Sequence, residues 1–244
     1  MSETVQVTQH GHVGVLTLNR PDRRNALTME MRAHLSAALS DFDGNDDVRV
    51  VILQGAPPTF CAGVDLGETL TSSTSVPADL PESVSAPFAR FTKPLFASVN
   101  GAAAGGGLEI ALACDFIMAS TSATFLLPEV RLGSLPGGGG TQRLARVIPR
   151  GMAARMLYTG DTMDASSALT LGLVTELVAP EGLEERAMAL ATQIASNAPL
   201  SLRAIKQCLQ AAASSPLSDG LAVERGLWAQ LATTEDRAEG RALR

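Results

Sequence analysis

Cysteine is scarce in this sequence of 244 residues, and it contains no long apolar run. Cys61, Cys114 and Cys208 are odd in number and share no CxxC spacing, which is typical of proteins from a reducing compartment. The longest apolar runs, at residues 108–113 and 116–119, fall far short of the roughly 20 residues that span a bilayer. The first residues show no basic stretch followed by an apolar core, so we expect no secretory signal. These features predict a cytoplasmic protein without a membrane partner.

Positive charge is also in short supply. Lys and Arg total 19 against 25 Asp and Glu, which gives a formal charge of −6. An acidic surface does not follow a phosphate backbone, so we expect no nucleic-acid partner. Apolar residues make up 45% of the chain and charged residues only 18%, a composition that excludes a disordered chain and supports one or two globular domains.

The sequence lacks the residue patterns of covalent and metal-assisted catalysis. No GxSxG segment is present, and Cys61 has no histidine nearby because the three histidines all lie within the first 34 residues. His10 and His12 would share one face of a strand, but a third metal ligand is missing. Neither glycine-rich run fits the GxGxxG or P-loop patterns of nucleotide sites. We therefore expect no metal site, no nucleotide fold and no cysteine nucleophile.

Strands and helices alternate along the first three quarters of the chain. Apolar residues at helical spacing between residues 27 and 42 predict an amphipathic helix, and the almost wholly apolar run 48–53 predicts a strand covered on both faces. Such alternation is typical of an α/β fold. The other expected elements are a hairpin at 5–7 and 13–18, strands at 95–99 and 115–119, and a helix at 107–113.

The character of the chain changes after residue 180, where segments rich in Ala, Leu and Glu replace the strands. Asn-Ala-Pro and Ser-Ser-Pro separate these segments and predict breaks between helices. The helices are expected at 183–196, 200–213 and 219–232. We predict an α/β core over residues 1–182, which carries the site, and a helical subdomain over residues 183–244.

One glycine-rich run leads into a candidate catalytic group. Residues 100–107 read Asn-Gly-Ala-Ala-Ala-Gly-Gly-Gly and predict a strand, a tight turn and a helix N-terminus, where free N–H groups favour developing negative charge. Glu109 follows in an otherwise apolar helical run, where a carboxylate is costly to bury. It lies three residues after Gly106, on nearly the same face of the helix. The alternative is that the glycines only allow close packing and that Glu109 faces solvent or bonds to the backbone.

A second carboxylate, Glu129, follows another apolar run and Pro128, where a strand is expected to end. Two carboxylates in apolar surroundings suit an acid–base pair that adds or removes water. A third segment, residues 60–66, ends a strand with small residues, which gives its N–H groups room to approach a ligand. Whether these three segments converge depends on the fold.

Together these segments resemble the crotonase superfamily, also called the enoyl-CoA hydratase/isomerase family. The resemblance begins with LTLNRP at residues 16–21 and Asn-Ala-Leu at 25–27. It continues through FCAGVDL, KPLFASVNGAAAGGGLEIALACD and FLLPEVRLGSLPGGGGTQRL to the terminal helices, and so covers nearly the whole chain. It implies a spiral of repeated ββα units with a C-terminal helical trimerisation region, assembled as a homo-trimer or as a hexamer of two trimers. It also implies an acyl-CoA substrate and no cofactor, metal or redox group beyond the coenzyme A of that substrate.

The resemblance further implies roles for individual residues. The N–H groups of Val64 and Gly106 would bind the thioester oxygen as it becomes an enolate, an interaction worth a few kcal/mol. Glu109 would take a proton from the attacking water, and Glu129 would deliver a proton to Cα. The residues implied to bind the CoA or acyl part are Arg23, Arg24, Ala26, Ala62, Gly63, Val64, Asp65, Leu66, Gly105, Gly106, Pro128, Leu132 and Gly137. The glycines near 139–141 are expected either to shape the acyl pocket or to serve the structure.

Keeping both glutamates, 20 residues apart, favours a lyase: an enoyl-CoA hydratase of lipid and fatty acid metabolism, which converts a trans-2-enoyl-CoA to a 3-hydroxyacyl-CoA. Isomerases of the family typically keep one of the two. The alternatives are double-bond isomerisation, dehydration of a specialised acyl-CoA, or acyl-CoA binding without catalysis. The Ser-, Thr- and Pro-rich stretch between residues 67 and 85 is either a wall of the binding pocket or a surface insertion.

The C-terminal end departs from the family pattern. Members usually end in a basic tail whose cations help to bind the CoA phosphates. Residues 239–244 here read Glu-Gly-Arg-Ala-Leu-Arg, so Arg241 and Arg244 are the candidates to replace that tail.

Overall fold

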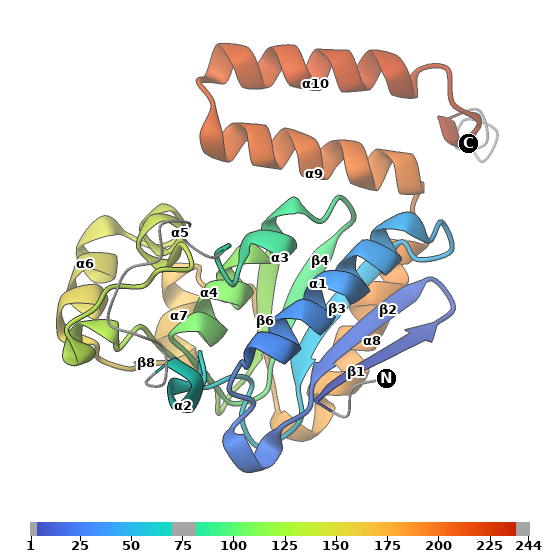
Figure 1. The fold of residues 1–244 in the computed structure, drawn as a ribbon. Helices are drawn as coiled ribbons and strands as arrows, with labels where there is room; N and C mark the ends of the chain where they lie inside the picture. Colours follow the sequence, from blue (N-terminus) through green and yellow to red (C-terminus); the bar gives the residue numbers. More distant parts are fainter. Residues whose placement is uncertain (1–3, 70–81, 238–244) are drawn as a thin grey trace.

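The computed structural model describes residues 4–69 and 82–237, and a six-stranded sheet lies at its centre (Figure 1). The strands follow the order β1-β2-β3-β4-β6-β9. β1 (Val5–His10) and β2 (Val13–Leu18) form the predicted antiparallel hairpin, and every other neighbouring pair is parallel. The remaining strands of this sheet are β3 (Val50–Gly55), β4 (Leu95–Val99), β6 (Phe116–Ser120) and β9 (Glu176–Val178).

Both faces of the sheet are covered, as the apolar run in β3 predicts. Val51 and Leu53 point into the larger core, which α1 (Met29–Gly44) and α4 (Gly106–Ala113) share. The alternate residues of β3 pack in a second core against α8 (Leu183–Ala195) on the opposite face. Side chains of a strand alternate between faces, so a strand buried on both must be apolar throughout.

A small sheet forms a second layer beside the large one. It contains β5 (Ala102–Ala104), β7 (Thr124–Leu126) and β8 (Met163–Asp164). β4 and β6 belong to the large sheet, and the strand after each, β5 or β7, belongs to the small one. Isolated parallel bridges from Cys61 to Ala103 and from Leu27 to Val64 extend this layer toward the N-terminus. The predicted spiral of ββα units is confirmed.

The helices fill the space around the two sheets, and their ends follow local side-chain chemistry. The Thr28 side chain accepts a hydrogen bond from the N–H of Met31 (3.1 Å) and caps the start of α1. The remaining helical segments are η1 (Pro21–Arg23), α2 (Leu66–Thr69), α3 (Ala86–Arg90), η2 (Glu129–Leu132), α5 (Gly140–Val147), α6 (Arg150–Thr159), α7 (Ala165–Leu171), η3 (Pro180–Gly182), α9 (Pro199–Ser214) and α10 (Leu217–Leu231). None of the described helices is long and apolar enough to cross a bilayer.

The three predicted C-terminal helices occupy two different places. α8 packs on the sheet with the core, whereas α9 and α10 form an arm that projects from the body (Figure 1). The buried Lys206 attaches α9 to the body, because its Nζ donates to the carbonyl oxygen of Lys93 (2.8 Å) and pairs with Asp115 Oδ2 (3.1 Å). Arg241 and Arg244, together with residues 70–81 of the polar stretch, lie outside the described residues.

Candidate active site

Three neighbouring turns of the spiral bring the predicted site residues to one edge of the small sheet. Ala103 of β5 pairs in parallel with Cys61 on one side and with Phe125 of β7 on the other. A few residues beyond these paired positions, each segment reaches a residue predicted for the site, namely Val64, Gly106 and Glu129. The register of the small sheet therefore brings together groups that lie far apart in the sequence.

The backbone amides of Val64 and Gly106 lie side by side. A Cβ placed on Gly106 would lie 3.5 Å from Val64 N and 3.2 Å from Val64 Cγ2. Gly106 opens α4, so its N–H has no partner within the helix and stands at the positive end of the helix dipole. Gly63 has φ +99°, and a Cβ there would come within 2.9 Å of the carbonyl oxygen of Ala104, so this close approach requires glycine. The arrangement suits two N–H groups that hold one oxygen bearing developing negative charge.

Glu109 is buried and held by two backbone amides. Its side chain lies one turn into α4, and the residue is 3% exposed. Oε1 accepts hydrogen bonds from the N–H groups of Gly138 (2.6 Å) and Gly140 (2.8 Å). Burial raises the pKa of this carboxyl, while the two amides and the positive charge of Arg143 act in the opposite direction. This position excludes a solvent-facing Glu109, whereas the alternative that Glu109 bonds to the backbone is what the structure shows.

Glu129 lies close by in a different environment. It opens η2 at the end of the small sheet, and it is half-buried. Its Oε2 is buried without a hydrogen-bond partner among the described residues. A Cβ on Gly105, which has φ +50°, would lie 3.0 Å from Glu129 Oε1, so this carboxyl packs against the turn before α4. Burial raises the pKa of Glu129, a hydrogen bond from its own backbone N–H acts in the opposite direction, and the charge of Glu109 raises the pKa further.

The glycine run 137–140 has a function that sequence reasoning missed. Its N–H groups hold Glu109, whereas the sequence suggested only a structural or pocket-shaping role. A Cβ on Gly138 would overlap Glu109 Oε2, and one on Gly140 would lie 3.0 Å from Oε1. The available signal was the position of the run directly before a helix, where N–H groups are free to bind an anion.

Arg143 and Ser85 are two further residues that sequence reasoning did not single out. Arg143 Nη1 donates to Ser85 Oγ and to the carbonyl oxygen of Gly138, both at 2.9 Å. Ser85 Oγ in turn donates to the same carbonyl oxygen. Nothing in the sequence connects residues 85, 138 and 143, because only the folded chain brings them together.

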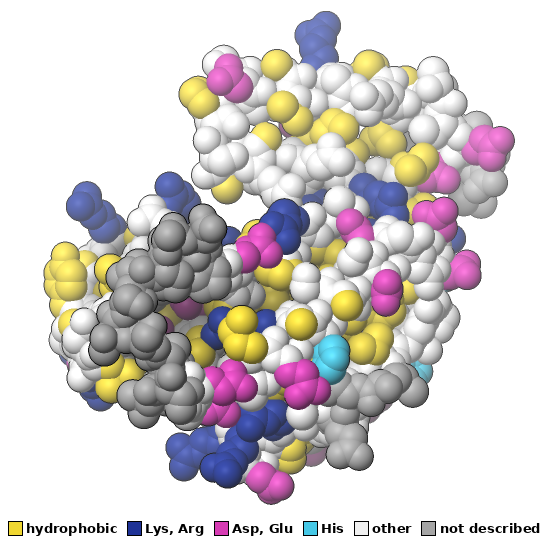
Figure 2. Space-filling model, in the orientation of Figure 1, with side chains coloured by type: hydrophobic (Ala, Val, Ile, Leu, Met, Phe, Trp, Pro, Cys, Tyr) yellow, Lys and Arg dark blue, Asp and Glu magenta, His cyan; other side chains and the backbone are white. Residues whose placement is uncertain are grey.

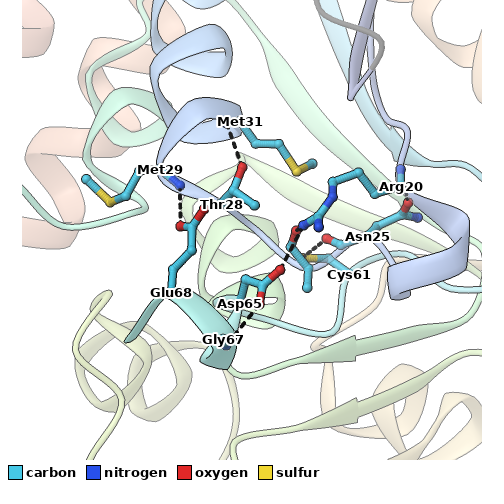
Figure 3. Close-up of polar contacts among 10 residues, drawn as sticks. Arg20, Asn25, Thr28, Met29, Met31, Cys61, Asp65, Gly67 and Glu68 are labelled. Carbon is cyan, nitrogen blue, oxygen red and sulfur yellow. Dashed lines mark hydrogen bonds and ion pairs between the residues drawn. The ribbon is translucent and has the colours of Figure 1, made fainter. Parts of the chain in front are cut away.

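The segment expected to approach CoA is fixed by polar contacts, which Figure 3 draws. Arg20 Nη1 donates to Asp65 Oδ2 (3.0 Å) and to the carbonyl oxygen of Ala26 (2.7 Å), and Asp65 Oδ1 accepts from the N–H of Gly67 (3.0 Å) (Figure 3). These bonds hold the pKa of the Asp65 carboxyl below its usual range. The carboxylate of Asp65 thus stabilises the turn that follows Val64.

Asn25 is a second anchor of this segment, and the sequence marked it only as part of a motif. Its buried amide nitrogen donates to the carbonyl oxygens of Ala56 (2.8 Å) and Thr59 (2.6 Å), and its Oδ1 accepts from the N–H of Arg20 (2.8 Å). Both Arg24 and Asn25 have positive φ, near 50°, a strained conformation that these bonds stabilise. The strained turn leaves the side chain of Arg24 exposed.

The other predicted binding residues border this region with different exposures. Arg23, Ala62, Gly137 and Leu132 are exposed, whereas Gly63 and Gly105 are buried and Ala26 and Pro128 are half-buried. Leu66 opens α2 directly after Asp65.

The thiol of Cys61 lies in the core beside this segment. It donates to the carbonyl oxygen of Asn25 (3.2 Å), and burial raises the pKa of the thiol to about 12. A thiol with this pKa is not a nucleophile at neutral pH, because the reactive form is the thiolate. Within residues 4–69 and 82–237, no cluster of three His, Cys, Asp or Glu side chains suits a metal ion.

The chain is similar in sequence and in structure to known proteins. The family described as enoyl-CoA hydratase/isomerase matches residues 8–243. A probable enoyl-CoA hydratase of Rhizobium meliloti (strain 1021) is 40% identical, and the (E)-benzylidenesuccinyl-CoA hydratase of Thauera aromatica is 41% identical. Each alignment covers 98% of this chain and 94% of the relative. The crystal structure of enoyl-CoA hydratase from Bacillus anthracis superposes with a TM-score of 0.92 at 34% identity, covering 98% of this chain and 95% of that one. The chain belongs to the enoyl-CoA hydratase/isomerase family, the crotonase superfamily.

Proposed function

We propose that this protein is an enoyl-CoA hydratase, a lyase that adds water across the trans-2 double bond of an enoyl-CoA thioester. The observation that carries the proposal is the meeting of two buried or half-buried carboxyls, Glu109 and Glu129, beside the paired amides of Val64 and Gly106. Family relatives named as hydratases support the same reaction class.

In the proposed reaction, the oxygen of a water held between the two glutamates attacks Cβ while the carboxylate of Glu109 takes one of its protons. The electrons of the double bond move toward the thioester, and the resulting enolate oxygen is held by the N–H groups of Val64 and Gly106. Protonated Glu129 then delivers a proton to Cα. One new C–O bond and one new C–H bond form, and the proton left on Glu109 returns the pair to its starting charge after exchange with Glu129.

The environments of the two glutamates support this division of roles. Two amides and a nearby guanidinium stabilise the ionised form of Glu109, which a base requires. Glu129 has one buried oxygen without a described partner and faces the charge of Glu109, and both conditions favour the protonated form that an acid requires. The two carboxyls share a single water in this scheme, so their apparent pKa values belong to the pair.

The proposal extends to the ligand and the assembly. The side chains of Arg23 and Arg24 are exposed near Ala26 and Ala62, and we propose that they bind the CoA phosphates. Catalysis would need no cofactor beyond the CoA of the substrate. Apolar side chains exposed along α9 and α10, visible in yellow on the arm in Figure 2, support the proposed trimer or hexamer. Three cysteines without a disulfide support a cytoplasmic location.

The direct test is to mix the purified protein with crotonyl-CoA and follow the loss of the conjugated enoyl-thioester absorbance. We expect rapid loss with the wild type and a severe reduction with Glu109→Gln and Glu129→Gln. Wild-type protein that binds CoA esters and yet leaves the absorbance unchanged would contradict hydration of simple enoyl-CoA substrates.

A further inference from the structure

We propose that Arg143 is a positioning residue for Glu109, acting with Ser85 by fixing the backbone conformation of Gly138. The inference rests on the proposed function, because it assumes that Glu109 acts as the base. Neither Arg143 nor Ser85 touches the Glu109 carboxylate by a hydrogen bond. They act on Glu109 through the backbone of Gly138, whose N–H donates to that carboxylate.

The backbone of Gly138 lies between Glu109 and the pair formed by Arg143 and Ser85. On one side, its N–H donates to Glu109 Oε1 at 2.6 Å. Arg143 Nη1 donates to its carbonyl oxygen at 2.9 Å, and the buried Ser85 Oγ donates to the same oxygen. Two donors on this carbonyl oxygen fix the orientation of the Gly138–Gly139 peptide, and so restrict the adjoining N–H of Gly138 that holds Glu109.

The position of the guanidinium is itself fixed. Arg143 lies in the first turn of α5, and its N–H bonds to the carbonyl oxygen of Gly139 (2.9 Å). Gly139 has φ +96°, a conformation that favours glycine, and a Cβ at that position would displace Arg143 Nη1 from its present place. The run of glycines and the arginine therefore form one structural unit.

Charge gives Arg143 a second effect on the base. Its side chain is half-buried and makes no ion pair with a carboxylate in the described part of the chain. The positive charge lowers the pKa of Glu109, against the effect of burial. Two other titratable groups act here: Glu129 on η2, and the thiol of Cys114 directly after α4. Asp115 and Lys206 act in turn on that thiol. Burial keeps that thiol neutral, so Arg143 is the cation that favours the ionised base.

A positioning role predicts changes that a general loss of stability would not produce. Arg143→Met should lower kcat about 10- to 100-fold, and it should move the acidic limb of the pH profile of kcat/KM toward higher pH, because Glu109 would ionise less readily. Arg143→Lys should return the acidic limb toward the wild-type pH while kcat stays low, since an ammonium keeps the charge without the planar donor geometry. Ser85→Ala should lower kcat by a smaller factor and leave the limb in place.

The matched control is Arg146→Gln, which removes an exposed arginine from the same helix, where it bonds only to Gln142. Crotonyl-CoA hydration at pH 5–9, thermal unfolding and binding of a CoA ester would be measured for each variant.

An Arg143→Met protein that is folded and keeps the wild-type pH profile and kcat overturns the inference. A wild type that hydrates no enoyl-CoA contradicts the proposed function instead, so the two failures are distinguishable. If Arg143→Met does not fold, the result depends on Arg143→Lys and Ser85→Ala, and unchanged kcat in both overturns the inference.

Discussion

The two glutamates of the site are the same residue type in the same pocket, and the chain treats them in opposite ways. Glu109 lies on a regular helix and receives two backbone N–H groups from a loop 30 residues downstream. Glu129 opens a short 3₁₀ turn and keeps one buried oxygen without a described partner. Burial raises the pKa of both carboxyls, but two amides from elsewhere in the fold and the charge of Arg143 oppose this effect at Glu109, whereas at Glu129 only its own backbone N–H does.

Removing each carboxyl in turn tests whether the two glutamates act together. Glu109→Gln and Glu129→Gln should each lower kcat for crotonyl-CoA by about 10²–10⁴, the usual contribution of one acid–base group. The double variant should be little worse than the more damaged single variant, because both groups act on one water. Steady-state kinetics on the three proteins checks this. Fully multiplicative losses would mean that the glutamates act independently.

A second test leaves both carboxyls in place and disturbs only the loop that holds one of them. Gly138→Ala places a methyl group against Glu109 Oε2 and 2.9 Å from Val84 Cγ1. We expect kcat to fall about 10- to 100-fold, since small displacements of a catalytic group have effects of this size. Gly151→Ala is the control, because nothing lies within 4 Å of a Cβ at that helical position. Equal kinetics for the two variants would show that the loop does not position Glu109.

Stability as a function of pH gives a smaller but independent effect. The pKa of Glu129 is raised in the folded protein, so ionising this carboxyl lowers the free energy of unfolding. This cost is absent below the ordinary pKa of a glutamate. It appears as the pH rises from that value to the raised pKa. Glu129→Gln should therefore increase the free energy of unfolding at pH 7–8 by about 0.5–2 kcal/mol, a gain that disappears near pH 4. Urea unfolding at fixed protomer concentration would measure it.

The same unfolding measurement on Glu109→Gln compares the environments of the two glutamates. The carboxylate of Glu109 already receives two N–H groups, so its replacement should give a smaller gain in stability than that of Glu129. A larger gain for Glu109→Gln would reverse the comparison between the two environments.

The smallest expected effect concerns the thiol in the neighbouring segment. Treatment of the folded protein with iodoacetamide at pH 7.5 should leave hydration unchanged, because Cys61 is buried with a pKa of about 12. Mass spectrometry of digested protein would identify the modified cysteines. Loss of activity that parallels modification of Cys61 would assign the chemistry to a nucleophile rather than to the two carboxyls.

Local patterns predicted most of the elements, because each depends on neighbouring residues. The helical spacing of apolar residues predicted α1, and the almost wholly apolar run predicted β3, which the structure places at 29–44 and 50–55. The glycine run before Glu109 predicted the start of α4. The C-terminal helices were also predicted, but their sequence did not distinguish α8, which covers the sheet, from α9, which a buried lysine attaches to residues just before β4 and β6.

By itself, the sequence determined the family, the α/β class and the identity of the candidate acid–base pair, because motifs, periodicity and a carboxylate in an apolar run are written in adjacent residues. The folding of distant segments onto one another determines which amides meet Glu109, why Oε2 of Glu129 is buried without a described partner, and how Arg143 and Ser85 join the site. These contacts connect residues about 30 to 60 positions apart. No local pattern encodes them, because the register of the small sheet and the close approach of glycine loops bring the groups together.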